Sequence, residues 1–110
     1  ILKLVDIWGR SVAHEQAKNG WVTGWKTDDK EILSLADDRG RTVAHELASY
    51  GWITGWTTED KEILKLVDIW GRSVAHEQAR HGWKTDDKEI LSLADNRGRT
   101  VAQIIAKKHI

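Results

Sequence analysis

The sequence contains no cysteine and no methionine. Without cysteine the chain can form neither a disulfide framework nor a thiolate metal site, so cysteine usage does not indicate a redox compartment. The absence of cysteine and methionine is the direction in which thermophile compositions lean. Because an initiating methionine is also missing, we expect a processed, excised or designed chain.

An excess of charge of one sign is also missing, because 17 basic and 17 acidic side chains cancel. Binding to a phosphate backbone through counterion release therefore has no obvious source, and nucleic acid is not expected as a partner. No apolar run approaches the roughly 20 residues of a membrane span, and the amino end lacks the order of a signal peptide. We expect a soluble chain that does not enter a membrane and whose localisation the sequence leaves unknown.

What the sequence does contain is one recurring segment, best seen in residues 37–52. Its copies follow at a period of 31 residues, shortened once to 27, and divide the chain into four units. These are units 1–31, 32–62, 63–89 and 90–110. Such a period is typical of a solenoid, in which each unit buries its apolar face against its neighbours. We expect one repeat domain, 1–110, with half a hairpin at each end.

Each full unit is predicted to contain two short helices. The first, over 27–37, starts at Thr27 as N-cap and carries apolar residues at helical spacing. A tight connection follows, with glycine at a positive φ. These structural glycines are Gly9, Gly40, Gly71 and Gly98. The second helix is predicted to start at the N-cap Thr42, with Ser11, Ser73 and Thr100 in the same role, and to end at Gly51, as at Gly20 and Gly82.

The segment Thr42-Val43-Ala44-His45-Glu46-Leu47-Ala48-Ser49-Tyr50-Gly51-Trp52 resembles the ankyrin repeat motif Thr-Pro-Leu-His-x-Ala-Ala-x-x-Gly-His. The resemblance covers nearly every unit and implies an all-α, ankyrin-like α-solenoid of stacked antiparallel helical hairpins. Two departures stand out. Val43 replaces the proline of the motif, and the β-hairpin between ankyrin units is predicted to be missing because Val67 reaches Gly71 in four residues. We expect the longer loops on the other edge, between the two helices of a unit.

Three histidines occupy the position of the histidine in the ankyrin motif: His14, His45 and His76. Each precedes a glutamate, but alanine stands where a zinc protease of the HExxH type has its second histidine. The resemblance implies instead that these histidines bridge backbone groups of adjacent units. Repetition also argues against an enzyme, because an active site is one asymmetric constellation. No catalytic residue, metal site or cofactor is expected.

Tryptophans mark the loops between the two helices of a unit and are expected to line one edge of the stack. They are Trp21, Trp25, Trp52, Trp56 and Trp83. Large, rigid aromatic side chains dominate interface energetics, so this edge is a candidate binding surface for a peptide or carbohydrate. The alternative to a binding role is that one tryptophan per unit folds back over the helix ends and closes the core. That role is expected of Trp21 and Trp52, which leaves Trp25 and Trp56 freer.

Alternate connections carry an apolar pair at the tip, in contrast to the charged tips between them. The pairs are Ile7 with Trp8 and Ile69 with Trp70. They indicate either a docking surface or local packing against neighbouring side chains. The two ends are also apolar, through Ile1, Leu2, Leu4, Val5, Ile104, Ile105 and Ile110. End-to-end contacts between chains would close into rings or extend as filaments. The alternatives are a segment of a longer array, or an ordinary C-terminal cap in which Lys107, Lys108 and His109 suit the negative end of the last helix.

The leading interpretation is therefore a non-enzymatic module for protein interaction or scaffolding, with another protein or a second copy of itself as partner. Self-assembly would proceed head to tail through the incomplete terminal hairpins. The alternative function is a binding module that uses the tryptophan-lined loop edge.

Overall fold

The computed structural model describes residues 11–51 and 55–107, apart from the side chain of Trp21. Over these residues every regular element is a helix, which confirms the expected all-α class, and β-type pairing is limited to isolated bridges. The longer helices are α1 (Val12–Lys18), α4 (Val43–Ser49), α7 (Val74–Ala79) and α9 (Val101–Lys107). The shorter helices are α2 (Gly20–Thr23), α3 (Lys30–Leu33), α6 (Lys61–Leu64) and α8 (Lys88–Leu91).

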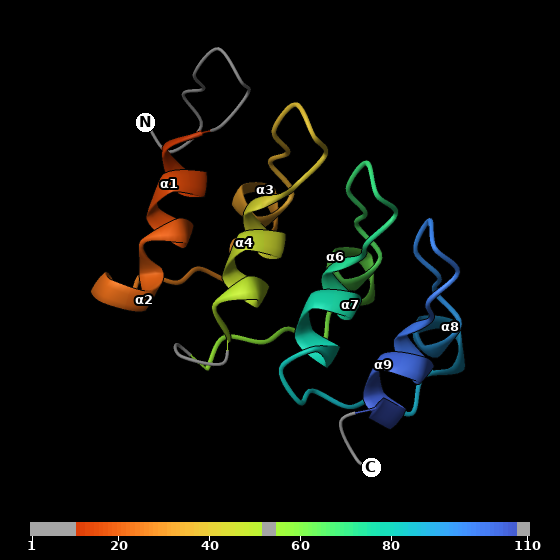
Figure 1. Cartoon of the computed structure of the whole chain (residues 1–110). Helices are drawn as coiled ribbons and strands as arrows, with labels where there is room; N and C mark the ends of the chain where they lie inside the picture. The colour runs from red at the N-terminus through yellow and green to blue at the C-terminus, as the bar shows by residue number, and fades with distance from the viewer. Residues whose placement is uncertain (1–10, 52–54, 108–110) are drawn as a thin grey trace.

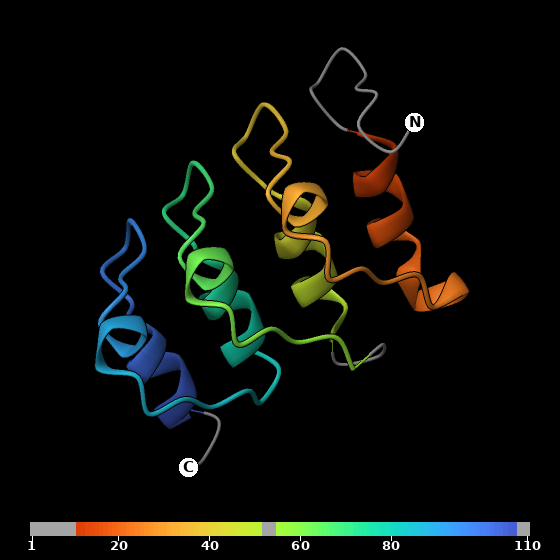
Figure 2. The same cartoon turned by 180° about the vertical axis from the view of Figure 1, so that it is seen from behind.

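The helices form two rows. Helices α1, α4, α7 and α9 lie side by side, each in contact with the next (Figure 1). Helices α3, α6 and α8 lie behind them, and each contacts the long helix that follows it in the chain (Figure 2). The core lies between the rows, where Leu33, Val43, Leu47 and Ile63 are at most 2% exposed. Because helices this short are marginal alone, burial between neighbours stabilises them.

The long helices begin as predicted, with a capping box. The Thr42 hydroxyl accepts a hydrogen bond from the His45 N–H at 3.1 Å, and His45 Nδ1 accepts one from the Thr42 N–H at 3.1 Å. The same exchange joins Ser11 to His14, Ser73 to His76 and Thr100 to Gln103. The predicted N-caps are therefore confirmed, because each satisfies backbone N–H groups that the first helical turn leaves unpaired.

The short helices are shorter than predicted. Instead of 27–37, α3 spans Lys30–Leu33 and is capped by Asp29, which accepts hydrogen bonds from the N–H groups of Glu31 and Ile32. Thr27 Oγ1 accepts the Asp29 N–H at 3.2 Å and so stabilises the loop before the helix. Gly20 does not itself end the preceding helix as predicted: α1 ends at Lys18, Gly20 begins α2, and α2 ends at Thr23 with Gly24 as its C-cap at a φ of 76°.

The connections from short to long helices are hairpin turns, so the prediction that such hairpins are missing is wrong. Single antiparallel bridges join Ala36 to Thr42, and the equivalent residues in the next two units. The Asp37 carboxylate closes the turn by accepting the N–H groups of Arg39 and Arg41 at 2.9 and 3.0 Å. Gly40 is required here, because its φ is 73° and a Cβ would lie 3.2 Å from the backbone of the next turn.

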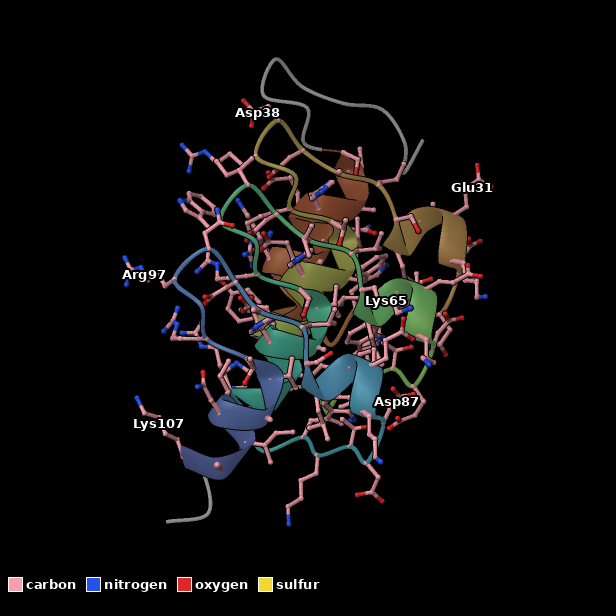
Figure 3. All side chains as sticks on the ribbon, turned by 90° about the vertical axis from the view of Figure 1, so that its right-hand side faces the viewer. Glu31, Asp38, Lys65, Asp87, Arg97 and Lys107 are labelled. Carbon is pink, nitrogen blue, oxygen red and sulfur yellow. The ribbon has the colours of Figure 1, made fainter. Side chains whose placement is uncertain are left out.

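These turns project together from one side of the molecule, which we call the turn edge (Figure 1). It comprises 37–40, 68–71 and 95–98. Adjacent turns are hydrogen-bonded, since the Ile69 N–H donates to the Arg39 carbonyl at 2.9 Å and the Asn96 N–H to the Trp70 carbonyl at 3.0 Å. Figure 3 shows Asp38 and Arg97 on this edge, across the molecule from Glu31.

Candidate interaction surface

The histidines predicted to be structural connect neighbouring long helices. His45 is buried, and its Nε2 lies 2.9 Å from the Arg72 carbonyl of the next unit. His14 and His76 make the equivalent contacts with the carbonyls of Arg41 and Arg99 at 2.9 and 3.0 Å. Because Nδ1 accepts a backbone N–H in the capping box, the proton is assigned to Nε2, which donates to the carbonyl. Burial lowers the pKa of His45, and the nearby Arg41 charge lowers it further.

A buried charge cluster lies between α4 and α7, with Arg41 at its centre. The Arg41 guanidinium donates to Glu46 at 3.1 Å and to Asp68 at 2.9 Å. Its third contact is Ser49 Oγ at 3.1 Å, which lies 3.0 Å from a carboxylate oxygen of Glu77. Burial acts to lower the pKa of Arg41, but the carboxylates of Glu46, Glu77 and Asp68 raise it overall. Every charge in this cluster therefore has a partner of opposite sign.

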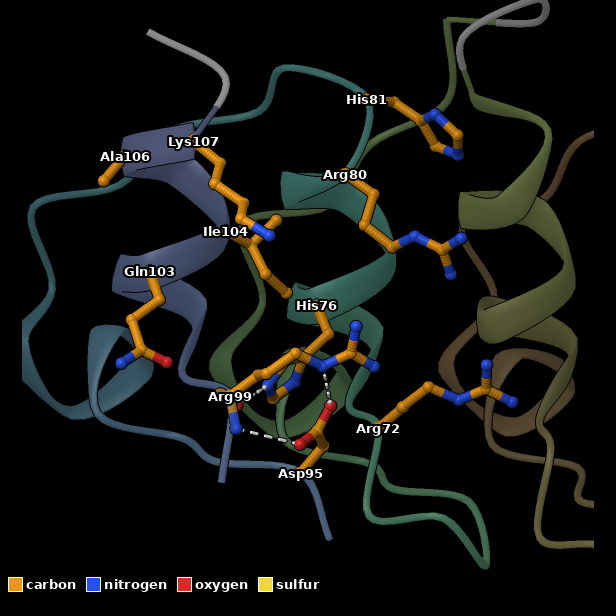
Figure 4. Close-up of a pocket in the computed structure, with 10 residues that line it drawn as sticks. All are labelled: Arg72, His76, Arg80, His81, Asp95, Arg99, Gln103, Ile104, Ala106 and Lys107. Carbon is orange, nitrogen blue, oxygen red and sulfur yellow. Dashed lines mark hydrogen bonds and ion pairs between the residues drawn. The ribbon is translucent and has the colours of Figure 1, made fainter. Parts of the chain in front are cut away.

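The corresponding place between α7 and α9 is an open hollow of about 810 Å³ (Figure 4). Here Arg72 stands in the position of Arg41, Arg80 in that of Ser49, and Ile104 in that of Glu77. The Arg72 guanidinium remains in its own turn, 3.2 Å from Asp68. The wall of the hollow contains the cations Arg72, Arg80, Arg99 and Lys107 and the carboxylate of Asp95.

A pair of exposed apolar residues lies at the turn edge beside this hollow. Ile69 is 56% exposed and Trp70 is 41% exposed. The Arg72 guanidinium lies 4.8 Å from the centroid of the Trp70 ring, a cation–π contact. A smaller hollow of about 240 Å³ reaches Trp70 and shares Arg72, Asp95 and Arg99 with the larger one. Apolar and cationic groups therefore form one continuous surface.

The tryptophans of the other edge are largely used in packing. The expectation that Trp56 is one of the freer tryptophans is wrong, because it is 4% exposed and its Nε1–H donates to the Thr27 carbonyl at 3.1 Å. Trp25 and Trp83 are partly buried against the core, and Trp83 Nε1–H donates to Glu59 at 3.0 Å. The packing of Trp56 depends on Gly51, since a Cβ at position 51 would lie 2.8 Å from the Trp56 carbonyl oxygen.

The predicted end-to-end contacts Ile104 and Ile105 are partly buried against the core of their own chain. Neither is therefore a fully exposed contact for another chain. Several further candidates lie outside the described residues: Ile1, Leu2, Leu4, Val5, Ile7, Trp8, Gly9, Trp52 and Ile110. The side chain of Trp21 is likewise outside them.

Sequence reasoning missed the cationic hollow. The signal that could have found it is a comparison of equivalent positions, since the glutamate of the first three units gives way to Ile104 in the last, and Arg80 and Lys107 stand where the second unit has Ser49. Among residues 11–51 and 55–107, no three His, Asp or Glu side chains are grouped so that they could hold a metal ion. Over the same residues, no helix is long and apolar enough to cross a membrane.

Comparisons with known proteins add no identification. No protein-family model matches the sequence, and no curated protein is significantly similar to it. The structure alone therefore supports a coarse description: the protein consists of short packed helices and has an exposed apolar and cationic surface.

Proposed function

We propose that the chain is a non-enzymatic protein-interaction module: an ankyrin-like solenoid of stacked helical hairpins that presents its turn edge to a protein partner. The observation that carries this proposal is the exposed Ile69–Trp70 pair, 56% and 41% exposed. Hydrogen bonds to both neighbouring turns hold this pair in place. A rigid aromatic side chain beside arginines is the composition found at interface hot spots.

The test is a change that we call the tip exchange, Ile69→Asp with Trp70→Arg. It gives this turn the sequence of 37–40, which already forms the same turn in the preceding unit. Native and exchanged chains are immobilised in parallel, and the retained proteins are quantified by mass spectrometry. A partner should be retained by the native chain and lost with the tip exchange.

The matched control is Val22→Ser, which removes a 66% exposed apolar residue on α2, away from the turn edge. This variant should retain the same partner as the native chain. Equal retention by the native chain and the tip exchange would show that the turn edge is not the interaction surface.

Head-to-tail self-assembly into a ring or filament is the second candidate function. Ala102 and Ala106 of α9 are exposed, whereas their counterparts in α4 and α7 are at most 1% exposed beneath the next long helix. At the first long helix, Gln16 Oε1 is buried without a hydrogen-bond partner among the described residues. The equivalent oxygen of Gln78 accepts the Thr58 N–H of the preceding unit at 2.8 Å. Both features suit stacking of a second copy.

Sedimentation over a wide concentration range separates the two candidates. Stacking predicts a mass that rises with concentration and returns to that of the monomer in Ala102→Glu with Ala106→Glu. A mass that stays monomeric at every concentration would exclude self-assembly and leave the partner-binding function.

A further inference from the structure

The hollow between α7 and α9 is lined by four cations and one carboxylate. Its cations are Arg72, Arg80, Arg99 and Lys107. Two of the cations lie near carboxylates outside its wall, Arg72 at 3.2 Å from Asp68 and Arg80 at 3.6 Å from Glu77. Asp95 is already occupied, since it accepts hydrogen bonds from the Arg99 guanidinium at 3.0 Å and from two backbone N–H groups at 2.9 Å. In the described part of the chain, the terminal guanidinium nitrogens of Arg72 and Arg99 donate no hydrogen bond. The hollow is therefore suited to an anion.

The chain contains its own example of such an anion, at the equivalent place one unit earlier. There the Glu77 carboxylate lies 3.0 Å from Ser49 Oγ and 3.8 Å from the Arg41 guanidinium. In the hollow Ile104 replaces that glutamate, and the serine is replaced by Arg80, whose side chain is 53% exposed. The internal carboxylate has been removed while the positive charge around its position has increased.

We propose that this hollow binds the carboxylate side chains of an acidic, extended segment of a protein partner. This inference deepens the interaction function proposed above and rests on it. Arginine guanidinium groups bind carboxylates through paired, charge-assisted hydrogen bonds. An extended segment fits better than a small molecule, because the site is open and continues through the smaller hollow to Trp70. An apolar residue of the segment would contact Trp70 while its acidic residues enter the hollow.

The test measures fluorescence anisotropy of labelled octaglutamate titrated with the full chain at low salt. Native protein should bind it saturably. Ile104→Glu should weaken binding about tenfold, because it restores the internal carboxylate, and loss of a charged hydrogen bond has about this effect. Glutamate already occupies the equivalent positions 46 and 77, so the fold should accept the change. Arg80→Ser restores the serine at an exposed position and should also weaken binding about tenfold.

The proposal would be overturned by any of these outcomes: no saturable binding by the native chain, unchanged affinity in both variants, or equally tight binding of octalysine. An oligonucleotide of equal charge that bound as tightly would also overturn it, by showing attraction to any polyanion.

The tip exchange distinguishes this proposal from the interaction function. If it abolishes partner retention while octaglutamate fails to bind the native chain, the interaction function stands and the acidic-segment site fails. If Ile104→Glu and Arg80→Ser weaken octaglutamate binding while the tip exchange leaves partner retention unchanged, the acidic-segment site stands and the turn-edge function fails.

Discussion

The α4/α7 and α7/α9 interfaces share one plan but differ in their polar interior. In both, a buried histidine contacts a carbonyl of the next unit, at 2.9 Å from His45 and 3.0 Å from His76. Between α4 and α7, Arg41 is surrounded by carboxylates and its side chain is 15% exposed. Between α7 and α9, the equivalent Arg72 borders an open cationic hollow. The difference follows from substitutions at two equivalent positions, Ile104 for glutamate and Arg80 for serine.

Some contacts are common to both interfaces and stabilise the stacking of units, whereas the polar groups around Arg41 are present at only one of the two. The histidine contacts and capping boxes recur, so they serve the stacking that every unit needs. The charge cluster between α4 and α7 does not recur between α7 and α9, although the same capped helix and hairpin turn surround it. Departures from a repeated pattern that packing does not require are therefore where binding is best sought.

Arg41→Ala should have the largest effect, because it would leave the largely buried Glu46 without its cation and would remove one of the two cations near Asp68 and near Glu77. Removing one partner of a buried ion pair costs about 3–5 kcal/mol of unfolding free energy. The matched change, Arg72→Ala, should cost about 1 kcal/mol or less, since Arg72 is more exposed and Asp68 retains Arg41. Urea unfolding of both variants measures the difference. Equal losses would mean that the two interfaces are not energetically distinct.

His45→Gln and His76→Gln should cost similar amounts, about 1–3 kcal/mol each, because both lose a partly buried hydrogen bond to a backbone carbonyl of the next unit. Gln103 shows that glutamine can preserve the capping box, since its Oε1 accepts the Thr100 N–H at 2.9 Å. Thermal denaturation followed by circular dichroism measures the loss. A melting temperature that fell on adding a chelator would contradict the structural role of these histidines and indicate a bound metal.

Acidification should reduce stability through His45. Its folded-state pKa lies below the ordinary value of 6.5, so below that pH the unfolded chain binds more protons. The contribution of His45 to the free energy of unfolding is complete above its unfolded-state pKa. It is lost as pH falls toward the folded-state pKa, by up to ~1.4 kcal/mol per pH unit. Urea unfolding at pH 7 and about pH 5 should show a smaller decrease in His45→Gln and in Arg41→Ala, which removes a charge that lowers this pKa. Identical decreases in all three proteins would exclude His45 as the source.

Part of the fold could be predicted because its signals are local. Thr42 and Ser73 precede their helices by one residue, and a side-chain cap needs no distant partner. The bounds of the short helices were less predictable. Thr27 and Asp29 are both good N-caps, and the residues after Leu33 lead into a hairpin bridge at Ala36 instead of continuing the helix. Which tryptophan turns inward depends on a distant contact, the Thr27 carbonyl of the preceding loop for Trp56. Apolar spacing within one unit contains no information about that contact.

The candidate site was predicted only in part for the same reason. The exposed pair Ile69 and Trp70 could be singled out because it interrupts a pattern of charged tips. The hollow requires knowing that positions 72, 80 and 104 meet across two helices, and that arrangement becomes visible only with the fold.

The smallest effects should come from the ion pairs between short helices, each of which joins the first lysine of one short helix to the N-cap aspartate of the next. Lys30 lies 2.7 Å from Asp60, and Lys61 lies 3.0 Å from Asp87. The lysine side chains are 61% and 50% exposed, so solvent screens their attraction to the aspartates. Lys30→Ala and Lys61→Ala should leave the melting temperature nearly unchanged, and equally so, at low and high salt. A loss as large as that of Arg41→Ala in only one of them would place the difference between the interfaces in the outer row of helices and not in the Arg41 cluster.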